Sequence, residues 1–323
     1  MKDIRLIALL AAACGIAALT GLLADGFPLA AWLSGDETAG LILIELRLPR
    51  TLLGFVVGAS LGLSGAALQG YFRNPLADPG VIGVSSSAGL GAVAALYFGL
   101  AGLAGWILPA LAIAGAASGA ITLLLLAGRG ASATTLILSG VAVGALANAL
   151  VALAMNFSSN PWALSEIAYW LMGSLRNTSW TEIAIAAPPA GAGALLLLTT
   201  RRELDAMAFG EEGARAIGLN LRSLQLRLVA GTALAVGAGV AVAGAIGFVG
   251  LVVPHLLRRP TGHEPSRLLI PSALGGGALL MLADTGTRLV SGDGMPLYLG
   301  VMTALLGVPF FFHLIRSMGR LAP

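Results

Sequence analysis

The chain of 323 residues holds a single lysine, Lys2, and a single cysteine, Cys14. A phosphate-binding loop of the G-x-x-x-x-G-K-[ST] type requires a lysine near its end, and Lys2 leaves no room for the residues that would precede it. One cysteine cannot form a disulfide within the chain. If this protein moves a solute uphill, we therefore expect the energy to come from a partner subunit.

Charged residues are scarce as well. Only 10% of the residues are charged and 57% are hydrophobic, and the mean hydropathy is +0.91. Soluble domains carry about 25% charged residues. Uncharged apolar stretches, such as those between Arg50 and Arg73 and between Arg227 and His255, reach or exceed the ~20 residues with which a helix crosses a bilayer. The chain is therefore predicted to be a membrane protein.

The continuity of the apolar stretches predicts an all-α membrane fold that forms one domain over residues 1–323. Apolar residues do not alternate with a period of two, as they would in a membrane β-barrel. The eighth expected helix is short, and it could instead be a re-entrant segment. The ten expected helices cover residues 5–24, 51–72, 82–100, 105–127, 134–155, 181–200, 224–243, 246–258, 268–290 and 298–317.

The basic residues indicate the orientation, because loops rich in lysine and arginine stay in the cytoplasm. With both termini inside, 14 of the 18 basic residues fall on the inner side. The formal charge of +3 needs no nucleic-acid partner, because the cations are spread over helix ends and are not gathered on one face. The four basic residues on the outer side are Arg47, Arg50, Arg176 and Arg288.

Three of these outer arginines lie close to helix ends. Arg47 and Arg50 stand on either side of Pro49, which suits the first turn of the second expected helix, and Arg288 ends the ninth. Cations on the side that should be poor in them fit a docking surface for an acidic partner. The same side chains could equally reach lipid phosphate groups by snorkelling.

Small residues mark one face of the second expected helix. Gly54, Gly58 and Gly62 recur at every fourth position and so lie on the same side. Small residues let helix backbones approach each other in lipid. We expect this face to pack closely on a neighbouring helix.

Eight motifs follow one another along the chain. They are R-L-P-R-T at 47–51, L-S-G-A-A-L-Q-G at 63–70, R-N-P-L-A-D-P-G-V-I-G-V-S at 73–85, Y-W-L-M-G-S at 169–174, G-A-R-A-I-G-L at 213–219, A-G-A-I-G-F-V-G-L-V-V-P-H-L-L-R at 243–258, A-D-T-G-T-R at 283–288 and T-A-L-L-G-V-P-F-F at 303–311. In content and order they resemble the FecCD family of ABC-importer permeases, which serve iron–siderophore complexes, haem and vitamin B12. The resemblance runs from about residue 45 to the C-terminus.

The resemblance implies a type II ABC importer in the bacterial inner membrane. Two permease subunits of ten helices each, identical or related, would work with two cytoplasmic ATP-binding subunits and a periplasmic binding protein that delivers the cargo. The permease would not be an enzyme and would bind no cofactor of its own, because ATP and Mg²⁺ would sit on the partner subunits.

The resemblance also implies roles for particular residues. Arg47, Arg50 and Arg288 match the family's outer arginines, which meet acidic residues on the two lobes of the binding protein. This match favours docking over lipid contact.

Residues 203–222 match the cytoplasmic loop that couples the permease to the ATPase. The residues themselves suit a short helix with a left-handed cap at Gly218. An ordinary solvated loop is the alternative. The expected coupling residues are Glu211, Glu212, Gly213, Ala214, Arg215 and Gly218.

Asn74 and Leu76, after the second expected helix, match the family's inner gate. Polar side chains at the axis of a membrane bundle usually face the pathway or one another. Ser132 and Thr134 fall where the family has a second narrowing, although such hydroxyls can also bond to a neighbouring helical turn.

No metal site is predicted in the chain itself. His255, His263 and His313 lie on separate segments, and none has a partner at the spacing of a zinc or iron site. A metal in the cargo would travel inside its chelator.

Two other classes of function would require features that this sequence has little of. An ion-coupled secondary transporter would need carboxylates within the membrane, and Asp284 is the only acidic residue expected to be buried. A membrane enzyme would need a nucleophile and base, which the sequence does not display. The sequence favours an ABC-importer permease. Iron–siderophore complexes, the broadest group in the family, are its expected cargo, with haem and cobalamin as the alternatives.

Overall fold

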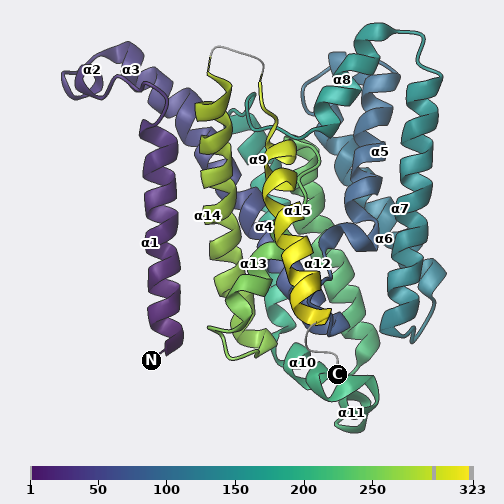
Figure 1. Ribbon diagram of the computed structural model, residues 1–323. Helices are drawn as coiled ribbons and strands as arrows, with labels where there is room; N and C mark the ends of the chain where they lie inside the picture. Colours follow the sequence, from purple (N-terminus) through teal and green to yellow (C-terminus); the bar gives the residue numbers. More distant parts are fainter. Residues whose placement is uncertain (1, 293–295, 320–323) are drawn as a thin grey trace.

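The computed structural model describes residues 2–292 and 296–319, and within these ranges it is a bundle of helices without strands (Figure 1). Seven helical stretches are long and apolar enough to cross a membrane. Their helices are α1 (Lys2–Leu23), α4 (Leu48–Phe72), α6 (Ile107–Ala127), α7 (Ala133–Asn156), α9 (Trp180–Thr199), α12 (Leu221–Ala243) and α14 (Pro265–Ser291).

Three further apolar helices complete the ten that the sequence predicts: α5 (Val84–Tyr97), α13 (Val249–Arg258) and α15 (Leu299–Gly319). The all-α prediction is confirmed for the described residues. The shorter elements are α2 (Leu29–Leu33), α3 (Glu37–Leu41), the π-helical turn η1 (Ile42–Arg47), the 3-10 turns η2 (Pro79–Ile82), η3 (Leu100–Gly102) and η4 (Met207–Phe209), α8 (Pro161–Leu171), α10 (Arg201–Ala206) and α11 (Gly210–Ala216).

Helix α4 lies at the centre of the bundle and packs against α14, α12, α13 and α9. Its predicted glycine face is used for close approach. Gly58 lies against the backbone of Gly276 on α14, and Gly62 lies against the carbonyl of Ser272 one turn away. A β-carbon at either glycine would collide with this backbone. Because helices in lipid associate through packing of this kind, the glycine face fixes α14 against α4.

Helix α1 is peripheral. It packs mainly on α14, and only 11% of its apolar window is buried inside the chain. In Figure 1 it stands at one edge of the bundle, beside α14. Cys14, at the middle of α1, donates to the carbonyl of Leu274 at 3.2 Å. The thiol is therefore a packing residue at the α1–α14 contact.

Two helices begin inside the bundle rather than at its ends. The chain turns back after α4, and α5 starts at Gly83, whose backbone lies against Gly140 and Gly144 in α7. Similarly, α13 starts after Phe248, a non-glycine residue with φ of 68°. These breaks explain why α5 and α13 are short.

Gln69 of α4 joins both breaks. Its side chain is 1% exposed, and its Nε2 lies 3.3 Å from each of the carbonyl oxygens of Ala77, Gly250 and Leu251. Its Oε1 accepts from Arg258 at 2.8 Å. Backbone groups freed at a break must find partners in a membrane. The Gln69 side chain supplies such partners at both breaks.

Candidate functional site

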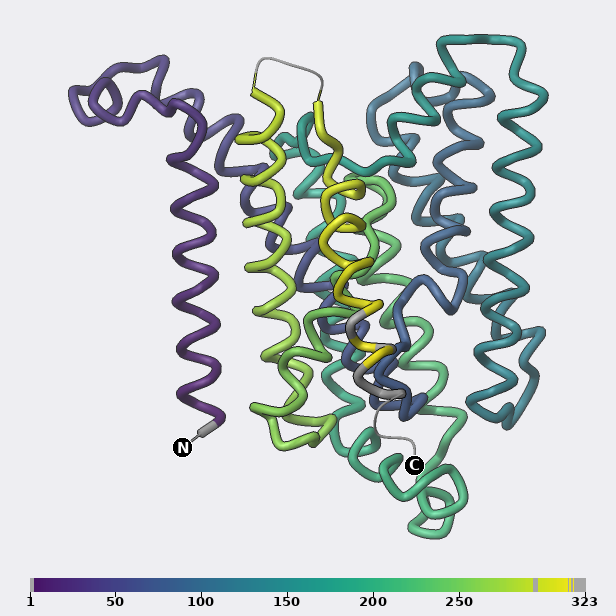
Figure 2. The backbone as a smooth tube through the Cα atoms, in the orientation of Figure 1, coloured from purple at the N-terminus to yellow at the C-terminus, as the bar shows by residue number. Residues whose placement is uncertain are grey.

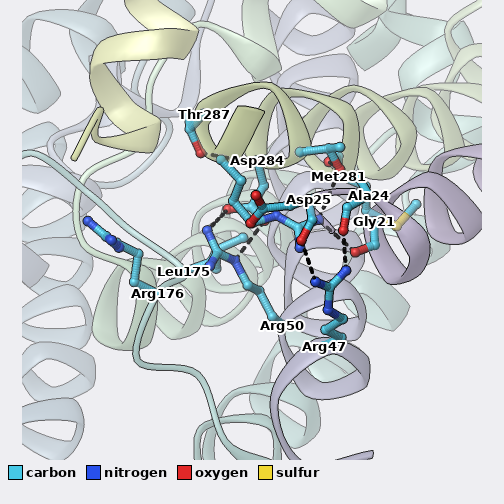
Figure 3. Close-up of polar contacts among 12 residues, drawn as sticks. Gly21, Ala24, Asp25, Arg47, Arg50, Leu175, Arg176, Met281, Asp284 and Thr287 are labelled. Carbon is cyan, nitrogen blue, oxygen red and sulfur yellow. Dashed lines mark hydrogen bonds and ion pairs between the residues drawn. The ribbon is translucent and has the colours of Figure 1, made fainter. Parts of the chain in front are cut away.

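The end of the bundle that is predicted to face outward carries an ion network between α4 and α14. Arg50 donates from Nε and Nη2 to the two carboxylate oxygens of Asp284, both at 2.8 Å (Figure 3). Arg288 approaches the same carboxylate at 3.8 Å. The side chains of Arg50, Asp284 and Arg288 are 17%, 7% and 11% exposed. The charges of this network are thus directed into the protein.

The same network holds the end of α1. The guanidinium of Arg47 donates to the backbone carbonyls of Leu22, Ala24 and Asp25, and Arg288 donates to the carbonyl of Gly21 at 2.6 Å. The last carbonyls of a helix have no partner within it, and they carry partial negative charge. The two arginines therefore cap α1.

The structure brings the three predicted docking arginines together, but each already has a partner within the chain. Arg50 is bound by Asp284, and Arg47 and Arg288 are bound by α1 carbonyls. A small cavity of about 110 Å³ lies beside the cluster, lined in part by Arg50, Arg288 and Arg176. Their role in docking stays a prediction.

Arg176 differs from its three neighbours because its side chain is exposed and has no polar partner among the described residues. Figure 3 shows it directed away from the Arg50–Asp284 pair. The charge distribution placed Arg176 outside, but no docking role was predicted for it. The acidic residues near each arginine in the sequence would not have singled out Arg176. The partner of Arg50 is Asp284, which lies far away in the chain, so the sequence does not show which outer arginine is left without an acid.

The backbone that presents Arg176 is held firmly. Leu175 and Thr178 on either side are buried, and the amide of Arg176 donates to the hydroxyl of Ser174 at 3.1 Å. Ser174 in turn donates its amide to the carbonyl of Ala243 at 2.7 Å, and Gly173 accepts from Leu299 at 3.0 Å. This outer turn, residues 173–178, therefore connects the end of α12 to the start of α15.

The segment predicted to couple to the ATPase, residues 203–222, comprises most of α10, all of η4 and α11, and the first residues of α12. It projects beyond the ends of the long helices (Figure 2). Two carboxylates anchor it. Glu211 accepts from the amide of Ala133 at 2.6 Å, and Asp205 accepts from the amide of Ser266 at 2.9 Å. These amides belong to the first turns of α7 and α14, where negative charge is favourable.

The end of α11 has the predicted cap. Gly218 has φ of 85°, its amide donates to the carbonyl of Arg215 at 2.9 Å, and the amide of Leu219 donates to Ala214 at 3.0 Å. This pair of bonds is the Schellman motif. The segment is accordingly a short helix with a defined end, rather than an irregular loop.

Of the other predicted coupling residues, Ala214 is buried, Glu212 and Arg215 are exposed, and Gly213 is half-buried. Arg215 lies 3.5 Å from Glu211 on the same helix. Two large apolar side chains here were not among the predicted coupling residues. Phe209 is 78% exposed and Ile217 is 67% exposed. An apolar residue in an otherwise charged cytoplasmic loop was the available signal.

The four predicted gate residues lie in two places. The Asn74 side chain accepts from the amide of Leu76 at 2.9 Å, forming a local turn below α4. Ser132 caps α7 by accepting from Thr135 at 3.2 Å, and Thr134 is exposed. No hydrogen bond among the described residues joins the first pair to the second. Their gating role stays a prediction.

Groups of three or more histidine, cysteine or acidic residues that could hold a metal ion do not occur among the described residues. The acid that a secondary transporter would use, Asp284, is indeed buried, but Arg50 neutralises it directly.

Comparison with known proteins gives concordant results. The model of the FecCD transport family matches residues 6–317. The chain is 42% identical over 281 residues to the cobalamin import system permease protein BtuC of Halobacterium salinarum, covering 87% of this chain and 75% of that protein. It is 41% identical over 292 residues to the vitamin B12 import system permease protein BtuC of Salmonella paratyphi A, covering 90% and 87%.

Two solved structures are similar in fold. A metal-chelate type ABC transporter in an inward-facing conformation matches with a TM-score of 0.89 at 30% identity, covering 97% of this chain and 99% of that one. PsaBC from Streptococcus pneumoniae, in complex with Fab, matches with a TM-score of 0.52 at 19% identity, covering 88% and 94%. The second likeness concerns the fold alone.

Proposed function

Because this chain belongs to the FecCD transport family and is the permease of an ABC importer, we propose that it imports a metal held in an organic chelate, with a corrinoid of the cobalamin type as the cargo. The observation that carries the choice of cargo is the identity of 41–42% to permeases named for cobalamin or vitamin B12 import. A ferric siderophore is the second candidate, favoured by the similarity to a metal-chelate type transporter.

Energy for import comes, in this proposal, from two cytoplasmic ATP-binding subunits that hold ATP and Mg²⁺. They contact the segment 203–222, whose exposed Phe209 and Ile217 supply apolar anchors. Because Glu211 and Asp205 attach this segment to the first turns of α7 and α14, a displacement of the segment acts on both helices. The remaining predicted coupling residues form the helix that transmits this displacement.

The cargo arrives on a periplasmic binding protein that docks at the outer arginines. Arg176 makes the first charge-assisted contact, since its side chain is exposed and has no polar partner to lose among the residues that the structure describes. Arg47, Arg50 and Arg288 form the cationic base beside it. Docking acts through the outer turn on the end of α12 and the start of α15. In this way the outer contact reaches helices inside the bundle.

The protein is a multi-pass inner-membrane protein, and we place both termini in the cytoplasm because most basic residues lie at that end. A second permease, identical or related, completes the pathway. Asn74, Leu76, Ser132 and Thr134 narrow its inner end. Ion coupling through Asp284 is disfavoured, because a carboxylate that binds and releases ions cannot remain paired with Arg50.

Uptake into vesicles tests the proposal. The permease is reconstituted with its ATP-binding subunits and binding protein, and cobalamin, a ferric siderophore and haem are offered in parallel. We expect accumulation of cobalamin that stops when ATP is withheld. Accumulation of the siderophore alone would replace the cargo and keep the mechanism, and accumulation without ATP that follows a proton or sodium gradient would overturn the mechanism.

A further inference from the structure

A buried glutamine joins the ends of three helices on the side of the bundle that carries the predicted gate. Gln225, in the second turn of α12, is 4% exposed, and its Nε2 donates to the hydroxyl of Tyr71 and to the backbone carbonyl of Ala131, both at 2.7 Å. Tyr71 lies in the last turn of α4 and is 0% exposed, and Ala131 directly precedes the N-cap of α7. This pair of hydrogen bonds, the Gln225 bridge, therefore ties together the ends of α4, α7 and α12.

The chemistry of the Gln225 bridge fixes its direction. A carbonyl oxygen only accepts hydrogen bonds, so the atom of the Gln225 side chain that faces Ala131 must be the nitrogen. This nitrogen carries two hydrogens, and the hydroxyl of Tyr71 accepts the second one. An apolar residue in place of Gln225 would leave a buried carbonyl and a buried hydroxyl without this donor, which is costly.

Each end of the Gln225 bridge is next to one of the two predicted gate segments. Tyr71 lies three residues before Asn74, and Ala131 is the neighbour of Ser132 in the chain. No direct hydrogen bond joins the gate residues of one segment to those of the other among the residues that the structure describes. The bridge thus supplies an indirect polar connection between the two segments, and this connection runs through α12.

The predicted coupling segment holds the same three helix ends. Glu211 accepts from the amide that begins α7 at 2.6 Å, and Glu203 accepts from Arg227 of α12 at 2.6 Å. A β-carbon built on Gly210 would lie 3.4 Å from Nη1 of Arg73, the C-cap of α4, so this arginine lies beside the backbone of the segment. The segment therefore contacts every helix end that the Gln225 bridge joins.

The three contacts differ in kind. The ends of α7 and α12 are attached to the coupling segment by carboxylates, whereas the end of α4 is attached by packing, because Arg73 makes no hydrogen bond or ion pair with the segment among the described residues. Fully paired buried polar contacts make their surroundings rigid. The end of α4 consequently depends on the Gln225 bridge for a polar link to the two helix ends that the segment pulls.

We infer that Gln225 and Tyr71 are positioning residues of the importer, which make the two predicted gate segments move as one unit when the coupling segment is displaced. The inference rests on the proposed function, because it assigns the link between the coupling segment and the inner gate. Both side chains are buried within the chain, so they act through the helix ends that they join and not by touching the cargo.

Three single variants of the complete importer test the inference. Gln225→Leu removes both hydrogen bonds of the bridge at similar side-chain size, and Tyr71→Phe removes only the hydroxyl. Thr261→Val is the matched control. Thr261 follows the end of α13, is 2% exposed, and donates its hydroxyl only to carbonyls of the preceding turn. Each variant loses a buried hydrogen bond, so a general loss of stability affects all three.

Import and ATP hydrolysis are measured in the same vesicles, with cobalamin as the probe. We expect the number of molecules imported per ATP hydrolysed to fall by about fivefold in Q225L, less in Y71F, and not at all in T261V. The ratio falls because the gate segments no longer respond together to each displacement. A merely structural role would lower import and hydrolysis in proportion, so an unchanged ratio in Q225L would overturn the inference.

The double variant Y71F/Q225L shows whether the two residues act through the same bridge. We expect its ratio of import to hydrolysis to equal that of Q225L, because the leucine has already removed the hydrogen bond to Tyr71. An additional loss equal to that of Y71F alone would show that Tyr71 acts independently of Gln225, which would overturn the bridge.

Hydrogen exchange provides a readout that needs no cargo. The change in Y71F is on α4, yet the amides of Leu136 and Ile137 near the start of α7 are expected to exchange with deuterium several times faster than in the wild type. T261V should leave them unchanged. Wild-type exchange at these amides in both Y71F and Q225L would overturn the inference. A wild type that imports no cobalamin would count against the proposed function, and exchange would still decide on the bridge.

Discussion

The outer and inner contact regions of this permease use their charges in the same way and differ in what they leave exposed. At the outer end, Arg50 is bound by Asp284 and Arg47 caps α1, so that Arg176 is the exposed arginine. At the inner end, Glu211 and Asp205 bind helix starts, and the large apolar side chains of Phe209 and Ile217 are exposed beside them. The buried charges act as anchors within the chain, and we expect the neighbouring exposed side chains to make the contacts with partners. The outer contact should therefore weaken with salt, and the inner one should not.

The largest effect is expected at the inner contact. Burying Phe209 and Ile217 against the ATP-binding subunits contributes about 1.5–3 kcal/mol for each side chain. The double variant F209A/I217A should release the ATP-binding subunits during purification. The control F98A/L103A makes the same kind of change on the outer side, where it removes side chains that are 70% and 74% exposed. This variant should retain the ATP-binding subunits. Full retention by F209A/I217A would refute the apolar inner contact.

A slightly smaller effect is expected from removing the outer anchor. Asp284→Ala leaves Arg50 and Arg288 buried without a counter-charge, which costs about 3–5 kcal/mol. The midpoint of thermal unfolding in detergent should fall clearly. Glu37→Ala, at an exposed acid on α3, should change the free energy of unfolding by less than about 0.5 kcal/mol. If D284A has the same midpoint of thermal unfolding as the wild type, the network does not hold α4, α14 and α1 together.

Reversal of the exposed outer charge should act on binding and leave stability unchanged. Arg176→Glu should weaken binding of the periplasmic binding protein by about 10- to 100-fold, the value of a charge-assisted hydrogen bond. Arg129→Glu reverses an exposed charge between α6 and α7 and serves as the control. Affinity is measured at low and high salt. If R176E and the wild type bind with equal affinity at low salt, Arg176 is not part of the docking surface.

The smallest effect is expected at the inner anchors. Glu211→Gln weakens the capping of α7, which costs about 1 kcal/mol. The ATP-binding subunits should stay bound, but stimulation of their ATPase by the binding protein should fall by about fivefold. Glu264→Gln is the matched control, since Glu264 lies on the same side and makes no capping bond. Unchanged stimulation in E211Q would show that the link to α7 carries no displacement.

Much of the fold could be predicted from the sequence because the lipid imposes a length on each apolar helix. The helix expected at 134–155 and the observed α7, Ala133–Asn156, differ by one residue at either end. The glycine face of α4 could also be predicted, because residues spaced four apart lie on the same side of a helix. The left-handed cap at Gly218 followed from residue type alone.

The missed features depend on contacts between distant segments or on departures from helical structure. Nothing local to Arg50 indicates that its partner is residue 284, 234 positions along the chain. The helix expected at 246–258 begins instead at Val249, because the apolar sequence before it is equally compatible with a helix and with an extended connection. Helix α8 was not predicted, although its start has two common signals: Asn160 caps the N-terminus, and Pro161 lies in the first turn.

ATPase stimulation across the membrane measures the communication between the two surfaces most directly. The complete importer is reconstituted with the ATP-binding subunits accessible outside the vesicles and the cargo-loaded binding protein sealed inside them. ATP hydrolysis is then compared with and without the binding protein. The account predicts a rise that R176E and E211Q each reduce, from opposite sides of the membrane. Equal hydrolysis with and without the binding protein would contradict it.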